Sequence, residues 1–151
     1  MNKPLITIGI TSFNSGKTIY KAINSALEQL WRPIEIVIVD DCSSDNAYQI
    51  LKELKKKNSE LRIFRNAKNK GVAYCRNKII EESQGEFLAF FDDDDISLKD
   101  RLIKQYLRIT NYEKFVQDSN FVICHSARKL IYKNKNNFIE NTMGEKLEGV
   151  A

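Results

Sequence analysis

Hydrophobic and polar positions alternate along the first two thirds of this chain in two distinct patterns. In one pattern, short runs rich in Ile, Val and Phe stand together, which is typical of strands buried in a sheet. In the other, apolar residues recur every three or four positions on a polar background, which predicts amphipathic helices. The strands are expected at 5–10, 34–40, 61–65 and 86–91, with a last one at 120–132. The helices are expected at 15–30, 43–57, 71–85 and 97–109.

Capping residues place some of the helix ends. Ser97 is followed by Asp100 three positions later, which is the spacing of a capping box at the start of the fourth helix. Ser and Asp residues at the start of the second helix are further cap candidates. Gly85 suits the position just after the third helix, where the left-handed conformation is common.

Strands and helices alternate in strict order along the chain. This order predicts an α/β, Rossmann-like fold, with a mostly parallel sheet that carries helices on both faces. Apolar residues become sparse from about residue 133. We therefore expect one globular domain at 1–132, followed at 133–151 by the start of a truncated or poorly ordered C-terminal region.

Composition and charge exclude several classes of protein. The chain has 151 residues, of which 42% are hydrophobic and 29% charged, and these values are ordinary for a soluble globular domain. The formal net charge of +4 is mild, and the lysine-rich stretch at 52–58 is better explained as the solvated end of a helix than as a nucleic-acid patch. We expect no nucleic acid among the partners.

The cysteines and the apolar runs bear on the cellular compartment. Three cysteines, Cys42, Cys75 and Cys124, are widely spaced and form no disulfide or zinc pattern, which favours a reducing compartment. The N-terminal apolar run is too short for a signal peptide, and no stretch approaches the ~20 apolar residues of a membrane span. We expect a cytoplasmic protein whose membrane contact, if any, is peripheral and at the inner face.

Polar and acidic residues follow three of the predicted strands. The first strand is followed by Thr-Ser-Phe-Asn at 11–14, the second ends in Asp40 and Asp41, and the fourth runs directly into Asp92–Asp95. Ligands of such sheets bind outside the carboxyl ends of the strands, so these residues are expected to converge on one site. Asp40 and Asp41 precede two serines and can equally be turn residues.

Four consecutive carboxylates after a buried strand need an explanation. An acidic run is usually solvated surface, but here it follows "FLAFF" without a break. A divalent cation such as Mg²⁺ or Mn²⁺ would remove the repulsion, because hard cations take carboxylate oxygens and share them with substrate phosphates. The sequence therefore favours metal and diphosphate binding at this segment.

Four ordered motifs resemble one family. "ITIGITSFN", "EIVIVDDCSSD", "NKGVAYCRNKIIEESQGEFLAFFDDDD" and the Asp-Arg-Leu that follows are similar to the donor-binding half of the inverting, family 2 glycosyltransferases with the GT-A fold. The resemblance covers roughly residues 4–105. Thr11 and Lys99 stand where the family often has proline, and neither change removes a ligand.

The resemblance implies roles for particular residues. Phe13 would stack on the base, Asp41 would accept a hydrogen bond from it, Asp93 would contact the ribose, and Asp94 would bind a divalent cation, Mn²⁺ or Mg²⁺. The full set of nucleotide-sugar contacts that it implies is Thr11, Phe13, Asn14, Asp41, Lys70, Gly71, Arg76, Asp92 and Asp93.

The implied reaction is metal-assisted transfer of a hexosyl or N-acetylhexosaminyl group in polysaccharide biosynthesis. The donor would be a nucleotide-diphosphate sugar, with UDP favoured by the pairing of Phe13 with Asp41, and the acceptor a glycan or a lipid-linked glycan. The family usually continues for another hundred residues or so, which carry the catalytic base, so we expect this base beyond residue 151. We also expect the 151-residue chain to bind nucleotide without efficient transfer.

Two other functions remain open from the sequence. A nucleotide-sugar-binding module without catalysis would need the same pocket. A P-loop-like nucleotidase is suggested by Gly-Lys-Thr at 16–18 after a strand, although Thr11 stands where a P-loop has its first glycine.

Overall fold

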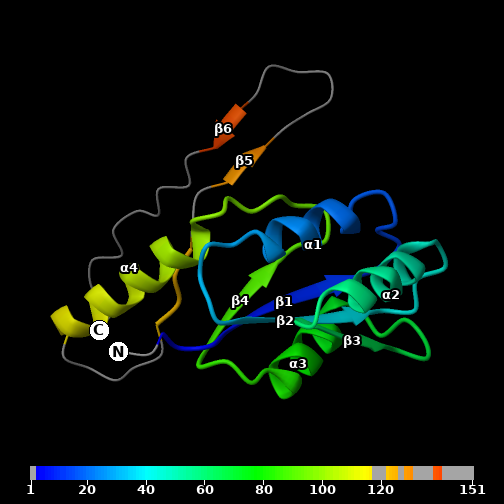
Figure 1. Cartoon of the computed structure of the whole chain (residues 1–151), viewed down its shortest axis with the longest axis horizontal. Helices are drawn as coiled ribbons and strands as arrows, with labels where there is room; N and C mark the ends of the chain where they lie inside the picture. The colour runs from blue at the N-terminus through cyan, green and yellow to red at the C-terminus, as the bar shows by residue number, and fades with distance from the viewer. Residues whose placement is uncertain (1–2, 117–121, 126–127, 131–137, 141–151) are drawn as a thin grey trace. The chain divides into compact units, whose positions relative to one another are not determined.

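The protein forms two compact units, Met1–Leu102 and Ile103–Ala151, in a computed structural model. The structure describes residues 3–116, 122–125, 128–130 and 138–140. The first unit contains a four-stranded sheet and three helices, and Figure 1 shows them along the chain. Its elements are β1 (Ile6–Ser12), α1 (Ile19–Leu27), β2 (Ile34–Asp40), α2 (Ala47–Lys57), β3 (Leu61–Arg65), α3 (Val72–Glu82) and β4 (Phe87–Phe91).

The sheet has the order β3-β2-β1-β4, and all its neighbouring strands are parallel. The chain therefore moves outward from β1 to β3 and then returns across the sheet to β4. Because parallel crossovers are right-handed, this reversal puts α3 on the opposite face from α1 and α2 (Figure 1). The order reverses between β1 and β4, and this switch point is where such sheets bind ligands. The predicted α/β fold is confirmed.

Each face of the sheet is buried by different side chains. Val37 and Val39 of β2 pack against Cys75 and Ile79 of α3, and all four are buried. The alternate residues of β1 and β2, among them Ile8 and Ile36, point to the other face and are also fully buried. Burial on both faces explains why the strands read as continuous apolar runs in the sequence.

Gly9, in the middle of β1, allows α3 to pack closely on the sheet. A Cβ atom at this position would lie 2.5 Å from Cγ2 of Ile79 and 3.3 Å from the ring of Phe90. Glycine is therefore required here by the close approach of α3.

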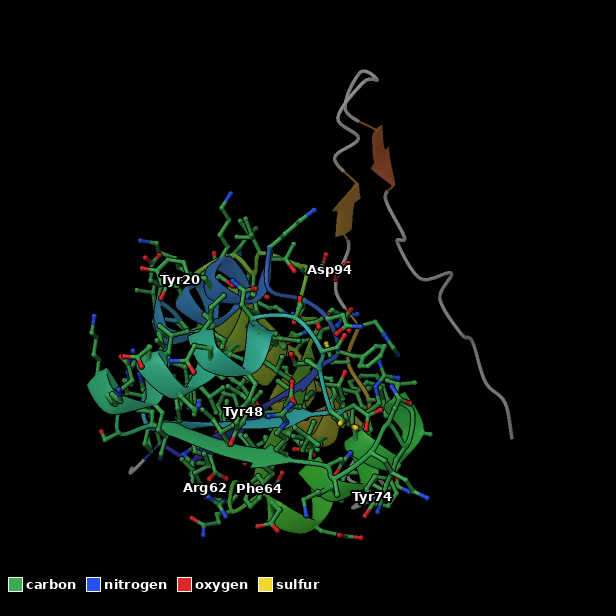
Figure 2. The ribbon with its side chains drawn as sticks, turned by 90° about the vertical axis from the view of Figure 1, so that its right-hand side faces the viewer. Tyr20, Tyr48, Arg62, Phe64, Tyr74 and Asp94 are labelled. Carbon is green, nitrogen blue, oxygen red and sulfur yellow. The ribbon has the colours of Figure 1, made fainter. Side chains whose placement is uncertain are left out.

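A polar network around Glu35 connects the amino ends of β1 and β2 with Arg62 of β3 and with the chain that follows α3. Oε1 of Glu35 accepts hydrogen bonds from Thr7 Oγ1 at 2.7 Å and from the backbone N–H of Gln84 at 2.6 Å. Arg62 donates to Oε2 of Glu35 at 3.1 Å and also pairs with Glu82. Figure 2 shows Arg62 beside Phe64, well away from Asp94. Burial would raise the pKa of Glu35, but these hydrogen bonds and the Arg62 charge lower it below its ordinary value.

Several predicted helix ends are wrong. α1 begins at Ile19 instead of residue 15, and α3 ends at Glu82, before Gly85. α4 (Arg101–Val116) begins four residues after Ser97, so Ser97 is no cap. The backbone N–H of Ser97 donates to Ser25 Oγ at 3.1 Å, and the carbonyl of Leu98 accepts a hydrogen bond from Gln29 Nε2 at 2.8 Å. These tertiary bonds hold 97–98 out of the helix.

The second unit contains most of α4 and an antiparallel pair of short strands, β5 (Arg128–Leu130) and β6 (Phe138–Glu140). The predicted strand at 120–132 is only partly correct, because 122–125 has no regular structure and β5 covers 128–130. The rest of that range lies outside the described residues, as does the expected domain boundary at 132/133, which stays a prediction. No helix in the described part of the chain is long and apolar enough to cross a membrane.

Candidate functional site

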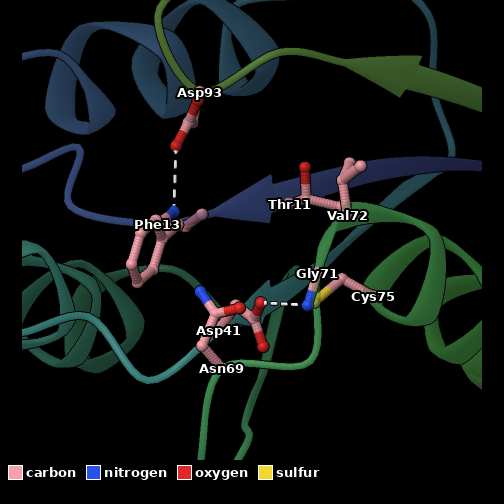
Figure 3. A pocket seen from close by; sticks show the side chains of 9 residues that line it. Thr11, Phe13, Asp41, Asn69, Gly71, Val72, Cys75 and Asp93 are labelled. Carbon is pink, nitrogen blue, oxygen red and sulfur yellow. Dashed lines mark hydrogen bonds between the residues drawn. The ribbon is translucent and has the colours of Figure 1, made fainter.

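A pocket of about 240 Å³ lies at the carboxyl ends of β1, β2 and β4, beside the first turn of α3 (Figure 3). It contains five of the residues predicted from the sequence, Thr11, Phe13, Asp41, Gly71 and Asp93. Ser12, which belongs to the 11–14 segment expected at this edge, also lines the pocket, as do Asn69, Val72 and Cys75, which the sequence did not predict. The strand ends therefore converge as expected at the switch point of the sheet.

Asp41 is the most constrained side chain of the pocket. It is 4% exposed, and its carboxylate accepts hydrogen bonds from Asn66 Nδ2 at 2.7 Å, the backbone N–H of Lys70 at 2.9 Å and that of Gly71 at 2.7 Å. Burial would raise the pKa of Asp41, but these bonds outweigh it and hold the pKa below its ordinary value. Asp41 therefore stays ionised and fixes the loop that leads into α3. The Cys75 thiol also bonds to this carboxylate, which lines the pocket.

Asn66 and Cys75 support Asp41, and neither was predicted. Asn66 Nδ2 lies 2.7 Å from Asp41 Oδ1 and 3.4 Å from Cys75 Sγ. Burial and the nearby charge of Asp41 raise the pKa of Cys75 to about 11, so the thiol stays protonated at neutral pH. Asn66 directly follows β3, so reading the third strand end like the others would have found it. Nothing in the sequence around Cys75 signals its position.

Phe13 presents its ring at the mouth of the pocket. The residue is 50% exposed, which leaves a ring face available for stacking. Its backbone N–H donates to Asp93 Oδ2 at 3.3 Å, so the loop after β1 is joined to the acidic segment after β4 (Figure 3). Asn14 does not line the pocket. It holds the loop instead, with its Oδ1 accepting from the backbone N–H of Ser44 at 2.8 Å.

The same loop does not fit a P-loop. The N–H of Asn14 donates to Ser43 Oγ at 3.0 Å, and that of Gly16 to Asp45 Oδ2 at 2.8 Å. The N–H of Thr18 donates to the carbonyl of Ser15 at 2.9 Å. A P-loop cradles phosphates with its backbone N–H groups, and these are already bonded within the protein. The geometry therefore disfavours a P-loop nucleotidase.

The acidic segment Asp92–Asp95 forms a turn after β4. The backbone N–H of Asp95 donates to the carbonyl of Asp92 at 3.4 Å, which places Asp93 and Asp94 at the tip of the turn. Asp93 points into the pocket. Its pKa is raised by burial and by the charge of Asp94, against the lowering effect of hydrogen bonds from Ser15 and Phe13. Asp94 is exposed (Figure 2).

The donor set of this turn suits a cation that is shared with a substrate. Among the described residues, no three His, Cys, Asp or Glu side chains are gathered to enclose a metal ion. Mg²⁺ and similar ions are commonly bound by one or two carboxylates together with substrate phosphates and water. The hard oxygens of Asp93 and Asp94, adjacent to the pocket, fit this type of site.

The remaining predicted contacts lie outside the pocket lining. Arg76 Nη2 lies 3.8 Å from Asp92 Oδ1, and both side chains are about half exposed. Lys70 contributes its backbone N–H to Asp41, while its Nζ donates to Tyr74 Oη at 2.8 Å. A phosphate role for Arg76, Asp92 or the Lys70 ammonium stays a prediction.

A doubly wound parallel sheet with an acidic pocket at its switch point places this chain among the α/β proteins that bind ligands at the carboxyl ends of their strands. The family model described as glycosyl transferase family 2 matches residues 7–149, and the chain belongs to this family. The predicted GT-A fold and family are therefore confirmed.

Named relatives agree with this assignment. The chain is 33% identical to the Escherichia coli UDP-Glc:alpha-D-GlcNAc-diphosphoundecaprenol beta-1,3-glucosyltransferase WfaP, over 79% of this chain and 47% of that protein. The chain spans about half the length of the curated relatives it matches.

Solved structures have the same fold. S. aureus TarS 1-349 in complex with UDP-GlcNAc has a TM-score of 0.65 and 30% identity, and the match covers 72% of this chain and 32% of that one. The mannosyltransferase PcManGT from Pyrobaculum calidifontis, solved with GDP-Man and Mn²⁺, has a TM-score of 0.65 and 21% identity, over 70% of this chain and 32% of that one. At this identity, the second similarity supports the fold alone.

Proposed function

We propose that this chain is the donor-binding part of a glycosyltransferase that uses a UDP-sugar and a divalent cation. One observation carries the proposal. Phe13, Asp41 and Asp93, from the ends of three different strands, line one pocket at the switch point of the sheet. An aromatic face, a buried acceptor and a carboxylate are the groups that a base, its N–H donor and a ribose hydroxyl require.

The residues of the pocket suggest how the donor is held. The base would lie against the ring of Phe13, within reach of Asp41, and the ribose would face Asp93. The diphosphate would then extend toward the turn at Asp92–Asp95, where Asp94 with Asp93 would hold Mg²⁺ or Mn²⁺. Such a cation, when bound, neutralises the charge that develops on the departing diphosphate.

We infer that the transfer inverts the anomeric centre, as the family resemblance implies. The acceptor hydroxyl would displace the nucleoside diphosphate directly, and a carboxylate would take the hydroxyl proton. No acidic residue of the pocket is available for this step, because Asp41 holds the loop before α3 and Asp93 is bonded to the loop after β1. We therefore expect the base outside the part of the chain that the structure describes.

The relatives support the choice of donor and acceptor. TarS, at 30% identity, was solved with UDP-GlcNAc, and WfaP is named for UDP-Glc and for an acceptor linked to diphosphoundecaprenol. We therefore favour UDP over GDP, and a glycan or lipid-linked acceptor that the protein meets on the cytoplasmic side of a membrane.

Calorimetric titration tests the proposed donor site. The parent chain should bind UDP more tightly than GDP, and EDTA should weaken the binding. Asp94→Ala should keep the fold and lose the response to Mn²⁺, because its exposed carboxylate contributes to the cation and little to the core. Glu53→Ala, which removes an exposed carboxylate from α2, should behave as the parent. An unchanged Mn²⁺ response in Asp94→Ala would refute the metal assignment, and no affinity for UDP would refute the donor site.

A further inference from the structure

The acidic segment Asp92–Asp95 has a fixed cation beside it, independent of any metal. Arg101, the first residue of α4, donates from Nη2 to the carbonyl of Phe90 at 3.0 Å and from Nη1 to Ser97 Oγ at 2.9 Å. Its guanidinium also lies 4.2 Å from the centroid of the Phe91 ring. Arg101 therefore connects the end of β4 with the chain that follows the acidic segment, so that it spans the segment from one end to the other.

The environment of Arg101 is that of an internal counter-ion. Burial lowers the pKa of its guanidinium, while the charges of Asp92 and Asp95 raise it. An arginine stays charged under such conditions, because its ordinary pKa is so high. Among the described residues, its buried Nε has no hydrogen-bond partner. An unpaired buried donor is unfavourable, so the position of this guanidinium depends on its hydrogen bonds to Phe90 and Ser97 and on its contact with the Phe91 ring.

The other cations near the segment differ from Arg101. Arg76 approaches Asp92 only to 3.8 Å and is 49% exposed. Lys99 is 65% exposed and pairs with Glu28, at 3.2 Å. Water and salt screen both of these, whereas a partly buried guanidinium is screened much less.

We propose that Arg101 is a positioning residue, a built-in counter-cation that holds Asp92–Asp95 in its pocket-facing turn before any diphosphate or divalent cation binds. The turn presents Asp93 to the pocket and to the N–H of Phe13, so its shape decides where the carboxylates meet a ligand. The consequence for nucleotide binding rests on the proposed function, while the electrostatic role does not.

A double-mutant cycle tests the electrostatic role without any ligand. In EDTA, Arg101→Met should lower the thermal midpoint by about 4 °C, because it removes two hydrogen bonds and a charge beside carboxylates that are mostly exposed. Asp95→Asn should then raise the thermal midpoint when it is added to Arg101→Met. Added to the parent chain, the same substitution should leave the thermal midpoint unchanged or lower it. Arg101→Lys keeps the charge, so Asp95→Asn should not raise its midpoint. Lys99→Met, which removes a charge two residues away, should show no coupling to Asp95→Asn.

Additive effects of Arg101→Met and Asp95→Asn would overturn the proposal, since the guanidinium would then not compensate the carboxylate. If Arg101→Met does not fold, Arg101→Gln serves in the same cycle, because glutamine keeps a donor while removing the charge.

A comparison of UDP with uridine tests the positioning role. With Mn²⁺ present, Arg101→Gln should weaken UDP binding about tenfold and leave uridine binding unchanged, because only UDP carries the diphosphate that meets the turn. Equal losses for both ligands would indicate general damage and refute the positioning role. If the parent binds no UDP, the proposed function fails, and the ligand-free cycle still decides the role of Arg101.

Discussion

Asp41→Asn is the most informative single substitution, because it changes one atom of the side chain and alters three hydrogen bonds. The carboxylate holds the N–H groups of Lys70 and Gly71 and the amide of Asn66 at 2.7–2.9 Å. An asparagine offers one acceptor oxygen, and its own NH₂ group would face an N–H donor. Hydrogen bonds to a charged group contribute about 1.5–3 kcal/mol each. Losing one or two of them should lower the free energy of unfolding by about 3 kcal/mol.

The same substitution should act on ligand binding and on pH dependence. If the site is desolvated, UDP affinity should fall by about 1–3 kcal/mol, because a base donor loses its acceptor. The pKa of Asp41 is lowered in the folded protein, so the stability from its ionisation is present above its ordinary pKa and is lost as pH falls through the folded value. The stability difference between Asp41→Asn and the parent should therefore be largest at neutral pH and narrow in acid.

Urea unfolding at several pH values and titration with UDP measure these effects. Asp45→Asn is the matched control, since this exposed carboxylate also accepts two backbone N–H groups, those of Gly16 and Ala47, but does not line the pocket. It should cost about 1 kcal/mol of stability, as capping residues do, and leave UDP affinity unchanged. If Asp41→Asn had the same unfolding midpoint and the same affinity for UDP as the parent, the reasoning from its hydrogen bonds would be refuted.

Two further substitutions test other parts of the unit. Phe13→Ala should weaken UDP binding by about 1–3 kcal/mol, because a stacking face is lost. It should barely change the free energy of unfolding, because the removed ring is half exposed and the backbone N–H that bonds to Asp93 is kept. Equal affinity of variant and parent for UDP in a titration would show that Phe13 is not part of the site. Glu35→Gln should lower stability by about 2 kcal/mol at pH 7 and flatten the acid side of the stability profile, because the lowered pKa of Glu35 makes its contribution disappear as pH falls. Urea midpoints from pH 7 to pH 3 measure this, and parallel profiles for variant and parent would contradict it.

The strands were predictable because their apolar runs are continuous: β1 and β2 are buried on both faces, and the edge strands β3 and β4 are at least half-buried along most of their length. β2 and β3 have the bounds expected from their apolar runs, 34–40 and 61–65. Helix starts were less predictable, because contacts distant in sequence decide them. Ser15 pairs its hydroxyl with Ser12, at 2.9 Å, and accepts the N–H of Thr18 in a turn, so α1 starts later than its apolar period suggests.

The site was predictable to the extent that its residues follow strands. Thr11, Phe13, Asp41 and Asp93 stand at strand ends, and all four line the pocket. Cys75 lies inside a helix, where the sequence does not distinguish it from an ordinary core residue. The sequence could not distinguish the polar residues that line the pocket from those that hold the loops. Asn14 is an example. Its side chain bonds to Ser44 and does not line the pocket.

In this pocket the hydrogen-bond acceptors are carboxylate side chains, whereas their donors include backbone N–H groups. A substitution therefore removes an acceptor but leaves a backbone donor in place, and this predicts how each position responds. Asp41 and Asp93 accept from backbone N–H groups of Gly71 and Phe13, which every residue except proline supplies. A change of the Phe13 side chain therefore leaves the bond to Asp93 in place and affects only the ligand. A change of either carboxylate releases a neighbouring loop as well as a ligand contact, so it should lower stability and affinity together. Phe13 is accordingly a position where the residue, and with it the base preference, can vary without loss of the fold, whereas Gly71, with a φ of 85°, cannot be replaced without backbone strain.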